Sequence, residues 1–500
     1  MKVFLVELDG YNPTTSTVQT WRFSSHTGYD NAGTFYEPRI ENPGTFSRGI
    51  NGTAGGRAQT SWGEITLLNT DGGLNALADA YFDGRRVTVK AGQSTAAYAS
   101  FTVVMTATIE TVALERSRVS IRLRDKAVAL DTVFSAVQYA GSNVLPAGIE
   151  GTADDLKGQY KPRLLGRIAL MAPPCVNTSK LIYQCNSAQV ADVINVFDKG
   201  AYLSRGADYA SQSDMEGTAP SGGQYRVWPA GGCIRLGSSP YGTLTCSVAE
   251  SFAFTDISAA GLIQRILTEK GYTSADWVAA DFTALNQKTA ASLGLMVQDG
   301  ETTASLLDRI CQSVGAWWGF DRLGLFRVAR LDAPVGTAAA TLTEADLLDA
   351  ERQPATTQPL WQVTIRADAN YAVQDKPALA GSVAVDRAAW LAAASRDQSA
   401  QSEAVKTARL LADTLDEDSL LNGISQAQAE AARRLALYSA RRDTVTVTVP
   451  GDNATFNALD IGSVVNLQTA RLGYSTARLM TVVQVGRDDA SNHLDLTFWG

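Results

Sequence analysis

The last part of the chain, residues 443–500, constrains the fold more than any other stretch. Val445, Val447 and Val449 alternate with threonines, which is the two-residue period of a strand with one buried and one exposed face. Further segments rich in β-branched residues follow, with turn residues between them, at 464–467, 480–485 and 494–499. Short connections of this kind join antiparallel strands. The chain is therefore predicted to end in a small closed or nearly closed β-domain.

Composition limits the size and the class of the protein. A chain of 500 residues with 45% hydrophobic and 19% charged residues is globular and too long for one core, so we expect several domains. The formal net charge of -8 and the absence of a basic tract argue against a general nucleic-acid-binding surface. No apolar run approaches the roughly 20 residues that span a bilayer, and the N-terminus lacks a signal-peptide pattern. We expect a protein made in the cytoplasm without stable membrane insertion.

Residues 1–160 are predicted to form a first β-domain. Alternating segments at 2–8 and 19–24 are followed by a strand at 60–68, a short helix at 74–82, and further strands at 86–90, 101–113 and 118–124. The intervening segment 25–59 is rich in Gly, Asn and Thr and contains His26, Tyr29 and Tyr36. It is predicted to be a long arm, too polar for a core, that is functional or orders on contact with a partner.

The middle of the chain changes from strands to helices. Residues 161–252 contain short strand patterns separated by Pro, Gly and Ser, which predicts a β-rich insertion domain. Residues 253–355 are predicted to form an α/β domain of helices and a hairpin. Its first helix is capped by Asp256 or Ser258, and its second helix is capped by Thr302 or Thr303. A strand, a turn and a second strand follow Gly315.

Residues 356–500 are predicted to form a second terminal β-domain with a helical insertion at 375–442. A strand at 360–367 comes before weaker helical patterns at 383–394 and 403–411, and the strongest helix of the chain is expected at 425–442. Ser425 and Gln428 fit a capping box at its start. The fold class is thus α+β but predominantly β, with several domains and antiparallel β-domains at both ends of the chain.

The cysteines leave two interpretations open. The chain has 5 cysteines, without a C-x-x-C pair or a nearby histidine, and a cytosolic chain would keep them reduced. Four of them fall in one region, so a metal or iron-sulfur site stands beside the alternative of buried structural thiols. These four are Cys175, Cys185, Cys233 and Cys246; the fifth is Cys311.

A row of arginines is the most basic feature of the first domain. Arg118, Arg122 and Arg124 alternate with apolar residues, and Arg116 comes just before them, so the guanidiniums share a polar face. The face is predicted to be a solvated or inter-subunit ion-pair face. The alternative is contact with DNA phosphates or with an acidic neighbouring subunit.

The search for catalytic residues assigns none. The only histidines are His26 and His493, which leaves little for Ser-His, Cys-His or His-ligated metal chemistry. The glycine-rich segment 52–58 lacks the Lys-Ser/Thr and the strand-to-helix context of a phosphate loop. Carboxylate pairs such as Asp71 with Asp83, or Glu301 with Asp308, could serve a glycosidase only if the fold brought each pair together. We therefore expect no enzyme, no catalytic residue, no cofactor and no metal.

Two groups of aromatic residues also have alternative interpretations. Trp317 and Trp318 could contact a carbohydrate, but paired aromatics between a helix and a hairpin are more often part of a core. Trp228 and Tyr241 are the candidates for exposed aromatics of a receptor-binding surface.

The order of motifs along most of the chain resembles the tail-tip (baseplate) hub proteins of long-tailed bacteriophages and related prophages. The resemblance is most specific at 302–334, which begins TTASLLDRICQSVGAWWGF, and at 459–500, which ends HLDLTFWG. It also includes TSWGEITLLNTDGG from residue 60 onward and VFDKGAYLSRG from residue 196 onward. The segments 25–59 and 372–424 match no family motif.

This resemblance implies a mechanical role. Hubs of this kind are similar to two tube-like β-barrel or sandwich domains in one chain, so that a homotrimer presents six and adapts a six-fold tail tube to a three-fold tip. The implied partners are the distal tail protein, the tail tube proteins, central tip or fibre proteins and the tape-measure protein, with DNA only in transit. The implied location is the virion tail tip, after assembly in the host cytoplasm. The alternatives are a receptor-binding or distal tail protein and a tail-tip enzyme that degrades the cell wall.

Overall fold

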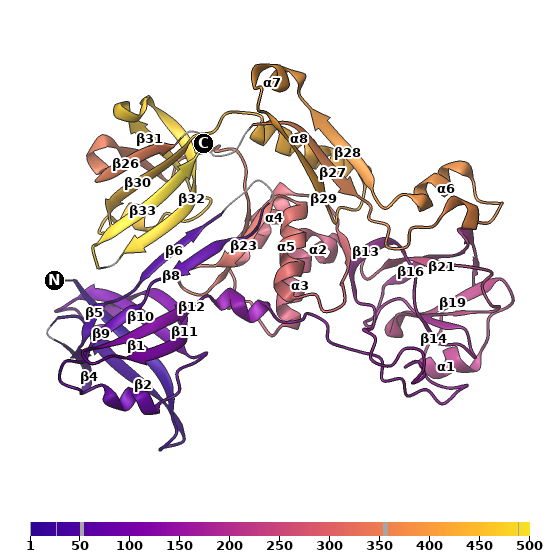
Figure 1. Cartoon of the computed structure of the whole chain (residues 1–500), viewed down its shortest axis with the longest axis horizontal. Helices are drawn as coiled ribbons and strands as arrows, with labels where there is room; N and C mark the ends of the chain where they lie inside the picture. Colours follow the sequence, from indigo (N-terminus) through magenta and orange to yellow (C-terminus); the bar gives the residue numbers. More distant parts are fainter. Residues whose placement is uncertain (1, 27, 51–54, 354–358, 489) are drawn as a thin grey trace.

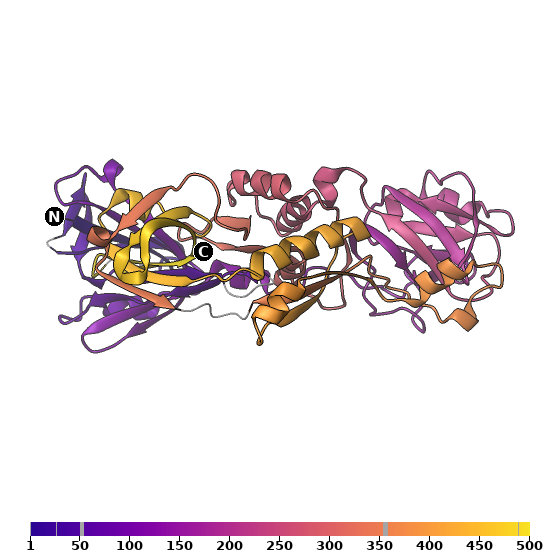
Figure 2. The ribbon, with the colours of Figure 1, turned by 90° about the horizontal axis from the view of Figure 1, so that it is seen from above.

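The computed structural model describes residues 2–26, 28–50, 55–353, 359–488 and 490–500. The chain is α+β and predominantly β, with strands in several separate sheets. Figure 1 shows two β-units beside each other at one end, helices in the middle and a further β-rich part at the other end. The same order along the long axis is visible from above in Figure 2.

The N-terminal β-unit is a nine-stranded sheet with the order β3-β4-β2-β1-β10-β11-β12-β9-β5. Most predicted strands are confirmed, and their alternating apolar residues, such as Val87, Val89 and Ile121, form its core. The single strand expected at 60–68 was wrong in part: it is interrupted at residues 63–64, and its first half pairs with β6 in another sheet. The helix expected at 74–82 is a shorter 3-10 helix, Asn75–Asp79. The main strands are β1 (Lys2–Asn12), β2 (Thr17–Ser24), β9 (Ile65–Leu68), β10 (Arg86–Gln93), β11 (Thr102–Leu114) and β12 (Arg118–Arg124).

The segment 25–59 differs from its prediction. Its described residues contain short strands, and Tyr36 and Phe46 are buried, so the expectation of an arm too polar for a core was wrong in part. The physical reason is that these strands pair with distant segments: β4 pairs with β2, and β6 pairs with β32. Residues 27 and 51–54 lie outside the described residues. The strands of this region are β3 (Tyr29–Asn31), β4 (Thr34–Pro38), β5 (Ile40–Asn42), β6 (Thr45–Gly49), β7 (Gly56–Arg57) and β8 (Gln59–Trp62).

The β-rich part at the far end contains two five-stranded sheets, with the orders β17-β16-β21-β13-β22 and β14-β15-β20-β19-β18. Residues of both sheets share one apolar core, including Ile168 and Val248 of the first sheet and Ile234 of the second. The elements are β13 (Leu164–Met171), β14 (Cys175–Asn177), β15 (Ile182–Gln184), β16 (Asp192–Asp198), β17 (Ala201–Tyr202), β18 (Ser204–Arg205), α1 (Gln212–Gly217), β19 (Gln224–Trp228), β20 (Cys233–Leu236), β21 (Leu244–Ala249) and β22 (Gly294–Met296).

The middle of the molecule is helical. The Ser258 and Thr302 side chains accept hydrogen bonds from backbone N–H groups in the first turns of α3 (Ala259–Glu269) and α5 (Thr303–Ser313), as predicted. Trp317 and Trp318 are buried in the hairpin of β23 (Ala316–Phe320) and β24 (Phe326–Arg330), which confirms their assignment to a core. The sequence analysis missed α4 (Ala279–Lys288), and α2 (Phe254–Ile257) precedes α3.

Three strands between residues 360 and 418 form a small sheet, β28-β27-β29, against which α8 packs. The segment around α6, between β27 and β28, packs instead on the far-end β-rich part, where Leu379 and Leu391 contact Leu170 and Phe197. The predicted capping box was wrong: the helix begins at Ile424 after Gly423, so Ser425 is already inside its first turn. The polar strands β28 and β29 were not predicted because neither alternates clearly. The elements are β27 (Leu360–Ala367), α6 (Val385–Ala392), β28 (Arg396–Gln401), α7 (Glu403–Ala408), β29 (Asp413–Asp418) and α8 (Ile424–Tyr438).

The C-terminal β-unit has an eight-stranded sheet whose main path is β25-β31-β32-β33-β30-β26. Val445, Val447 and Val449 point into its core, as their alternation predicted. The two end strands of this path, β25 and β26, do not pair with each other, so the described strands form an open sheet. The sequence predicted a closed or nearly closed β-domain, and a closed barrel is not observed among the described strands. Its elements are β25 (Ala340–Thr343), β26 (Asp349–Gln353), β30 (Thr444–Pro450), α9 (Ala454–Asn457), β31 (Val464–Thr469), β32 (Tyr474–Asp488) and β33 (His493–Trp499).

Candidate functional site at the junction of the two terminal β-units

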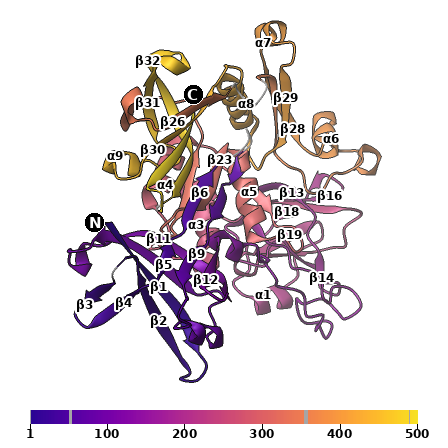
Figure 3. The ribbon, with the colours of Figure 1, turned by 60° about the vertical axis from the view of Figure 1, so that its left-hand side comes forward.

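Strand β6 connects the two terminal β-units. It comes from the N-terminal part of the chain but pairs antiparallel with β32, with Arg48 opposite Val485, and it also pairs with β8. The backbone N–H of Ile50 donates to the carbonyl of Val483 at 2.9 Å, which extends the contact by one residue. Figure 3 shows β6 leaving the N-terminal unit and running up to the C-terminal sheet. The two ends of the chain are thus joined by backbone hydrogen bonds rather than by side chains alone.

Strand β7 ties the same segment to the central hairpin. It pairs in parallel with β23, and the N–H of Ala58 donates to the Trp318 carbonyl at 2.7 Å. Gly55 has a φ of +90°, and a Cβ on it would lie 2.2 Å from the carbonyl oxygen of Ala316. Only glycine fits such a position. The described glycines of the glycine-rich segment therefore serve close packing, while residues 52–54 lie outside the described residues.

Arg48 is the central side chain of the junction. It is 1% exposed, its Nη2 lies 2.5 Å from Oδ1 of Asp460, and its guanidinium lies 5.4 Å from the centroid of the Trp317 ring. Its Nε and Nη1 have no hydrogen-bond partner among the described residues. A buried guanidinium that makes one hydrogen bond depends strongly on that bond and on the aromatic ring.

Arg327 adds a second bridge between the central hairpin and the C-terminal β-unit. Its Nη1 donates to Asp460 at 3.0 Å and its Nε donates to Asp281 of α4 at 2.6 Å. Burial alone would lower the pKa of Arg327, but the hydrogen bond to Asp281 and the charges of Asp281, Asp460 and Asp321 outweigh it and raise the pKa. Asp460 is thus shared by arginines from two other parts of the chain.

These residues line a cleft of about 520 Å³ between β6, the central hairpin and the C-terminal β-unit. Its carboxylates are engaged: Asp281 and Asp460 accept from arginines, and Asp321 accepts from the N–H groups of Leu323 and Leu325. An arginine side chain stays protonated and cannot act as a general base. The chemistry of the cleft is therefore suited to holding three parts of the chain together.

The carboxylate pairs considered for a glycosidase have structural partners. Asp71 forms a two-pronged ion pair with Arg39, which lowers its pKa to about 2. Glu301 accepts from Arg309 at 2.9 Å. Asp308 accepts from the indole N–H of Trp318 at 2.7 Å, and burial raises its pKa. Asp83 is exposed in a turn. These contacts explain Asp71, Glu301 and Asp308 without a substrate.

The cysteines form one close pair. Cys185 and Cys246 are fully buried, with their sulfur atoms 3.5 Å apart. The hydrogen bond between them, together with burial, raises the pKa of Cys185, and burial raises the pKa of Cys233, which keeps both as thiols. Cys175 is half-buried, and Cys311 lies in the helical core. Within the described residues no group of three or more His, Cys, Asp or Glu side chains is arranged to hold a metal ion.

The arginine row of β12 faces solvent. Arg118 pairs with Glu41 at 2.6 Å, and Arg122 lies 3.5 Å from Glu64, so both form solvent-exposed ion pairs within the chain, while ion pairs between subunits stay a prediction. Arg116 and Arg124 are exposed. Such surface pairs contribute little to stability.

The remaining candidates lie apart from the junction. His26 and His493 are exposed, Trp228 is half-buried, and Tyr241 is 94% exposed beside a cleft of about 290 Å³. The described part of the chain has no helix that combines the length and the apolar character needed to cross a bilayer. The sequence analysis missed Arg48, Arg327 and Asp460 because no local sequence pattern marks them, and their partners are distant in the sequence.

Comparison with known proteins gives matches among solved structures. No family model and no curated protein matches the chain. It is similar to the 43 kDa tail protein of prophage MuSo2 from Shewanella oneidensis, with 11% identity and a TM-score of 0.37, over 94% of this chain and 95% of that chain. A tail protein from Neisseria meningitidis MC58 gives 11% identity and a TM-score of 0.41, with the same coverage. A chain of a native gene transfer agent virion gives 16% identity and a TM-score of 0.45, over 69% of this chain and 85% of that chain.

Proposed function

We propose that this chain is a structural protein of a bacteriophage tail and that it forms the hub of the tail tip. The motifs at 302–334 and 459–500, which resemble such hubs, support this proposal. The observation that carries it is the join between the two terminal β-units through β6 and β32. One chain thereby presents two β-units as a single body, which is what a three-fold hub beneath a six-fold tube needs.

The Arg48–Asp460 contact explains how the two β-units keep a fixed relation. Three chains around the tail axis would place six β-units in one ring, continuous with the tail tube. The distal tail, tail tube, central tip or fibre and tape-measure proteins are the neighbours of such a ring, and DNA passes through its lumen. The weakly acidic net charge of -8 suits transit, because it adds no general attraction for phosphates.

Cryo-electron microscopy of the particle tests this function through the copy number and the position of the chain. Three copies around the axis, directly beneath the tail tube, are expected. Six copies in a ring, or copies away from the axis, would contradict the hub function and favour a distal tail or receptor-binding protein. Light scattering of the purified chain is a companion measurement, since a hub ring can require a partner before it closes.

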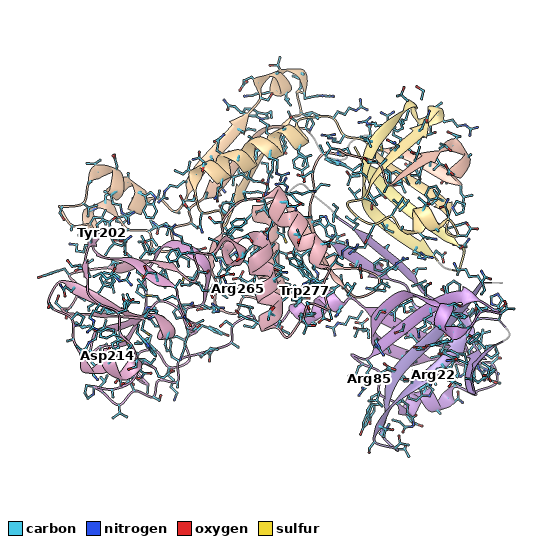
Figure 4. The ribbon with its side chains drawn as sticks, turned by 180° about the vertical axis from the view of Figure 1, so that it is seen from behind. Arg22, Arg85, Tyr202, Asp214, Arg265 and Trp277 are labelled. Atoms are coloured by element: carbon cyan, nitrogen blue, oxygen red, sulfur yellow. The ribbon has the colours of Figure 1, made fainter. Side chains whose placement is uncertain are left out.

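A second candidate function, receptor contact, is favoured by Tyr241. This residue is almost fully exposed on the β-rich part at the far end of the molecule from the terminal β-units. Tyr202, labelled on the same part in Figure 4, is also exposed. Exposed aromatic rings at a distal end are suited to a surface ligand. Loss of host adsorption in a Tyr241→Ala particle that still assembles would favour receptor contact. Normal adsorption would remove this support.

A further inference from the structure

An arginine cluster lies on the C-terminal β-unit, close to the end of α8 and away from the cleft at the junction. Its members come from β26, from β32 and from the short connection between α8 and β30. They surround the carboxylate of Asp443, which is 1% exposed, and Arg478 also donates to an oxygen of Gly500 at 2.7 Å. The arginine cluster consists of Arg352, Arg441, Arg442 and Arg478.

Asp443 is satisfied by only part of this cluster. Arg352 and Arg478 each donate to its Oδ2 at 2.8 Å, and the Tyr474 hydroxyl donates to the same oxygen at 2.9 Å. Burial opposes ionisation of Asp443, but these hydrogen bonds and the surrounding charges outweigh it and lower its pKa. A structural role for the buried carboxylate therefore requires Arg352 and Arg478, with Arg441 only loosely paired to it, and leaves Arg442 unexplained.

Arg442 is the clearest surplus charge. It forms no hydrogen bond or ion pair with another residue in the described part of the chain, and its Nε is buried without a partner. Its guanidinium lies 5.1 Å from the centroid of the Trp499 ring. Burial and, to a lesser extent, the nearby charge of Arg478 lower its pKa.

Arg441 completes the excess of positive charge. Its side chain is 58% exposed, and its Nε is 3.6 Å from the second oxygen of Asp443, too far for a good hydrogen bond. A helix C-terminus favours a nearby cation only weakly, which is too little to account for the whole cluster. The cluster concentrates positive charge on a chain whose net charge is -8.

Aromatic rings hold the cluster in place before anything binds. Arg352 lies 4.7 Å and Arg478 5.5 Å from the Tyr474 ring centroid, and Trp499 supports Arg442. Stacking and the bonds to Asp443 reduce the side-chain freedom that binding would otherwise remove. Both terminal nitrogens of Arg352 and of Arg478 already donate within the chain. The planar forks left to match a carboxylate are therefore those of Arg441 and Arg442.

We propose that the arginine cluster binds the carboxylates of an acidic segment of a neighbouring protein. Nucleic acid fits less well, because phosphate-backbone binding uses an extended basic track and this cluster is a single patch on an acidic chain. A second copy is an outcome of the test. In the most acidic strand, β29, Asp418 and Glu417 pair within the chain with Arg366 and Arg434, whereas Asp413 and Asp416 are exposed. The proposal does not depend on the hub function.

The test measures binding of two fluorescein-labelled probes to the full chain. One probe is a peptide of alternating glutamate and glycine, and the other is a thymidine oligonucleotide with the same number of negative charges. The test variant is Arg441→Gln with Arg442→Gln, because neither residue is a hydrogen-bond partner of Asp443. The matched control is Arg85→Gln with Arg86→Gln, another adjacent pair, on the N-terminal β-unit (Figure 4), in which Arg85 stacks on Tyr11 at 5.7 Å.

The peptide is expected to bind the unmodified chain and to bind the test variant at least about tenfold more weakly, with the control variant unchanged. Arg441→Lys with Arg442→Lys should lose part of the affinity, because the charge remains and the fork is removed. Unfolding midpoints verify that all variants fold. The proposal is overturned by absent peptide binding, by equal losses in test and control variants, by preferential binding of the oligonucleotide, or by self-association that requires the cluster.

Discussion

Arg48 and Asp460 are 412 residues apart in the sequence, and their side-chain atoms lie 2.5 Å apart at the junction of the two terminal β-units. Arg48 is buried, whereas the Asp460 side chain is about one third exposed and also accepts from Arg327. The contact therefore places a buried cation from one end of the chain against a carboxylate from the other end. Its removal would leave the cation desolvated and unpaired.

Asp460→Asn is expected to destabilise the chain by about 2 to 4 kcal/mol, below the upper range for buried pairs because Asp460 retains some solvent. Urea unfolding followed by tryptophan fluorescence measures this loss, since Trp317 lies against Arg48. Asp418→Asn is the control: Asp418 pairs with Arg366 at 3.1 Å but is 87% exposed. This control variant should lose less than about 1 kcal/mol of its free energy of unfolding. Equal losses would show that burial of Arg48 does not determine the effect.

Gly55→Ala tests the contact between β7 and β23. The new methyl group would meet the Ala316 carbonyl oxygen at 2.2 Å, in addition to the strain of a positive φ. A loss of about 3 kcal/mol is expected, measured as a lower unfolding midpoint. Gly33 has a similar φ of +88°, and nothing lies within 4 Å of a methyl group added there. Gly33→Ala therefore measures the backbone strain of the positive φ without a clash, and it should lose about 1 kcal/mol of stability. The clash interpretation fails if the two variants lose the same stability.

Local patterns explain what the sequence predicted well. The valine alternation of β30, the caps at Ser258 and Thr302, and the burial of Trp317 depend on neighbours within a few residues. Their physical causes, strand pleating, satisfied helix N–H groups and a short turn after a helix, are visible in single segments. The predominantly β fold class follows from the same signals.

Non-local pairing explains what the sequence did not predict. The partner of β6 is β32, more than 400 residues later, and the segment 45–49 has no apolar alternation that would predict a strand. The same holds for the arginine cluster, whose members are unexceptional in sequence and meet only because β26, β32 and the end of α8 converge on Asp443. A buried charge and its partner carry no local signature.

Asp308→Asn is expected to change the pH dependence of stability. Burial raises the pKa of Asp308 above 3.8, so the folded state holds its proton more tightly than the unfolded state does. Stability is therefore lost as the carboxyl ionises with rising pH. An asparagine stays neutral and can still accept from Trp318. The variant should gain stability relative to the unmodified chain between about pH 3 and pH 7 in urea titrations.

Glu430→Gln supplies the comparison of opposite sign. Burial opposes ionisation of Glu430, but Arg433 and Arg434 outweigh it and lower its pKa. Ionisation with rising pH therefore adds stability in the folded protein, and this contribution is lost as pH falls through the folded pKa. The glutamine variant should lose stability relative to the unmodified chain across the same pH range. Parallel curves for the two variants would contradict both assignments.

The helix caps allow a test of the point at which the sequence pattern and the structure disagree. Ser258→Ala and Thr302→Ala each remove a side-chain oxygen that accepts a first-turn N–H, at 3.1 Å and 3.2 Å. Each should cost about 1 kcal/mol, seen as a lower unfolding midpoint. Ser425→Ala should cost nothing or stabilise slightly, because Ser425 lies inside α8 after Gly423 and alanine is the better helix former. A cost near 1 kcal/mol for Ser425→Ala would mean that Ser425 does cap the helix in solution, as the Ser425 and Gln428 pattern predicts.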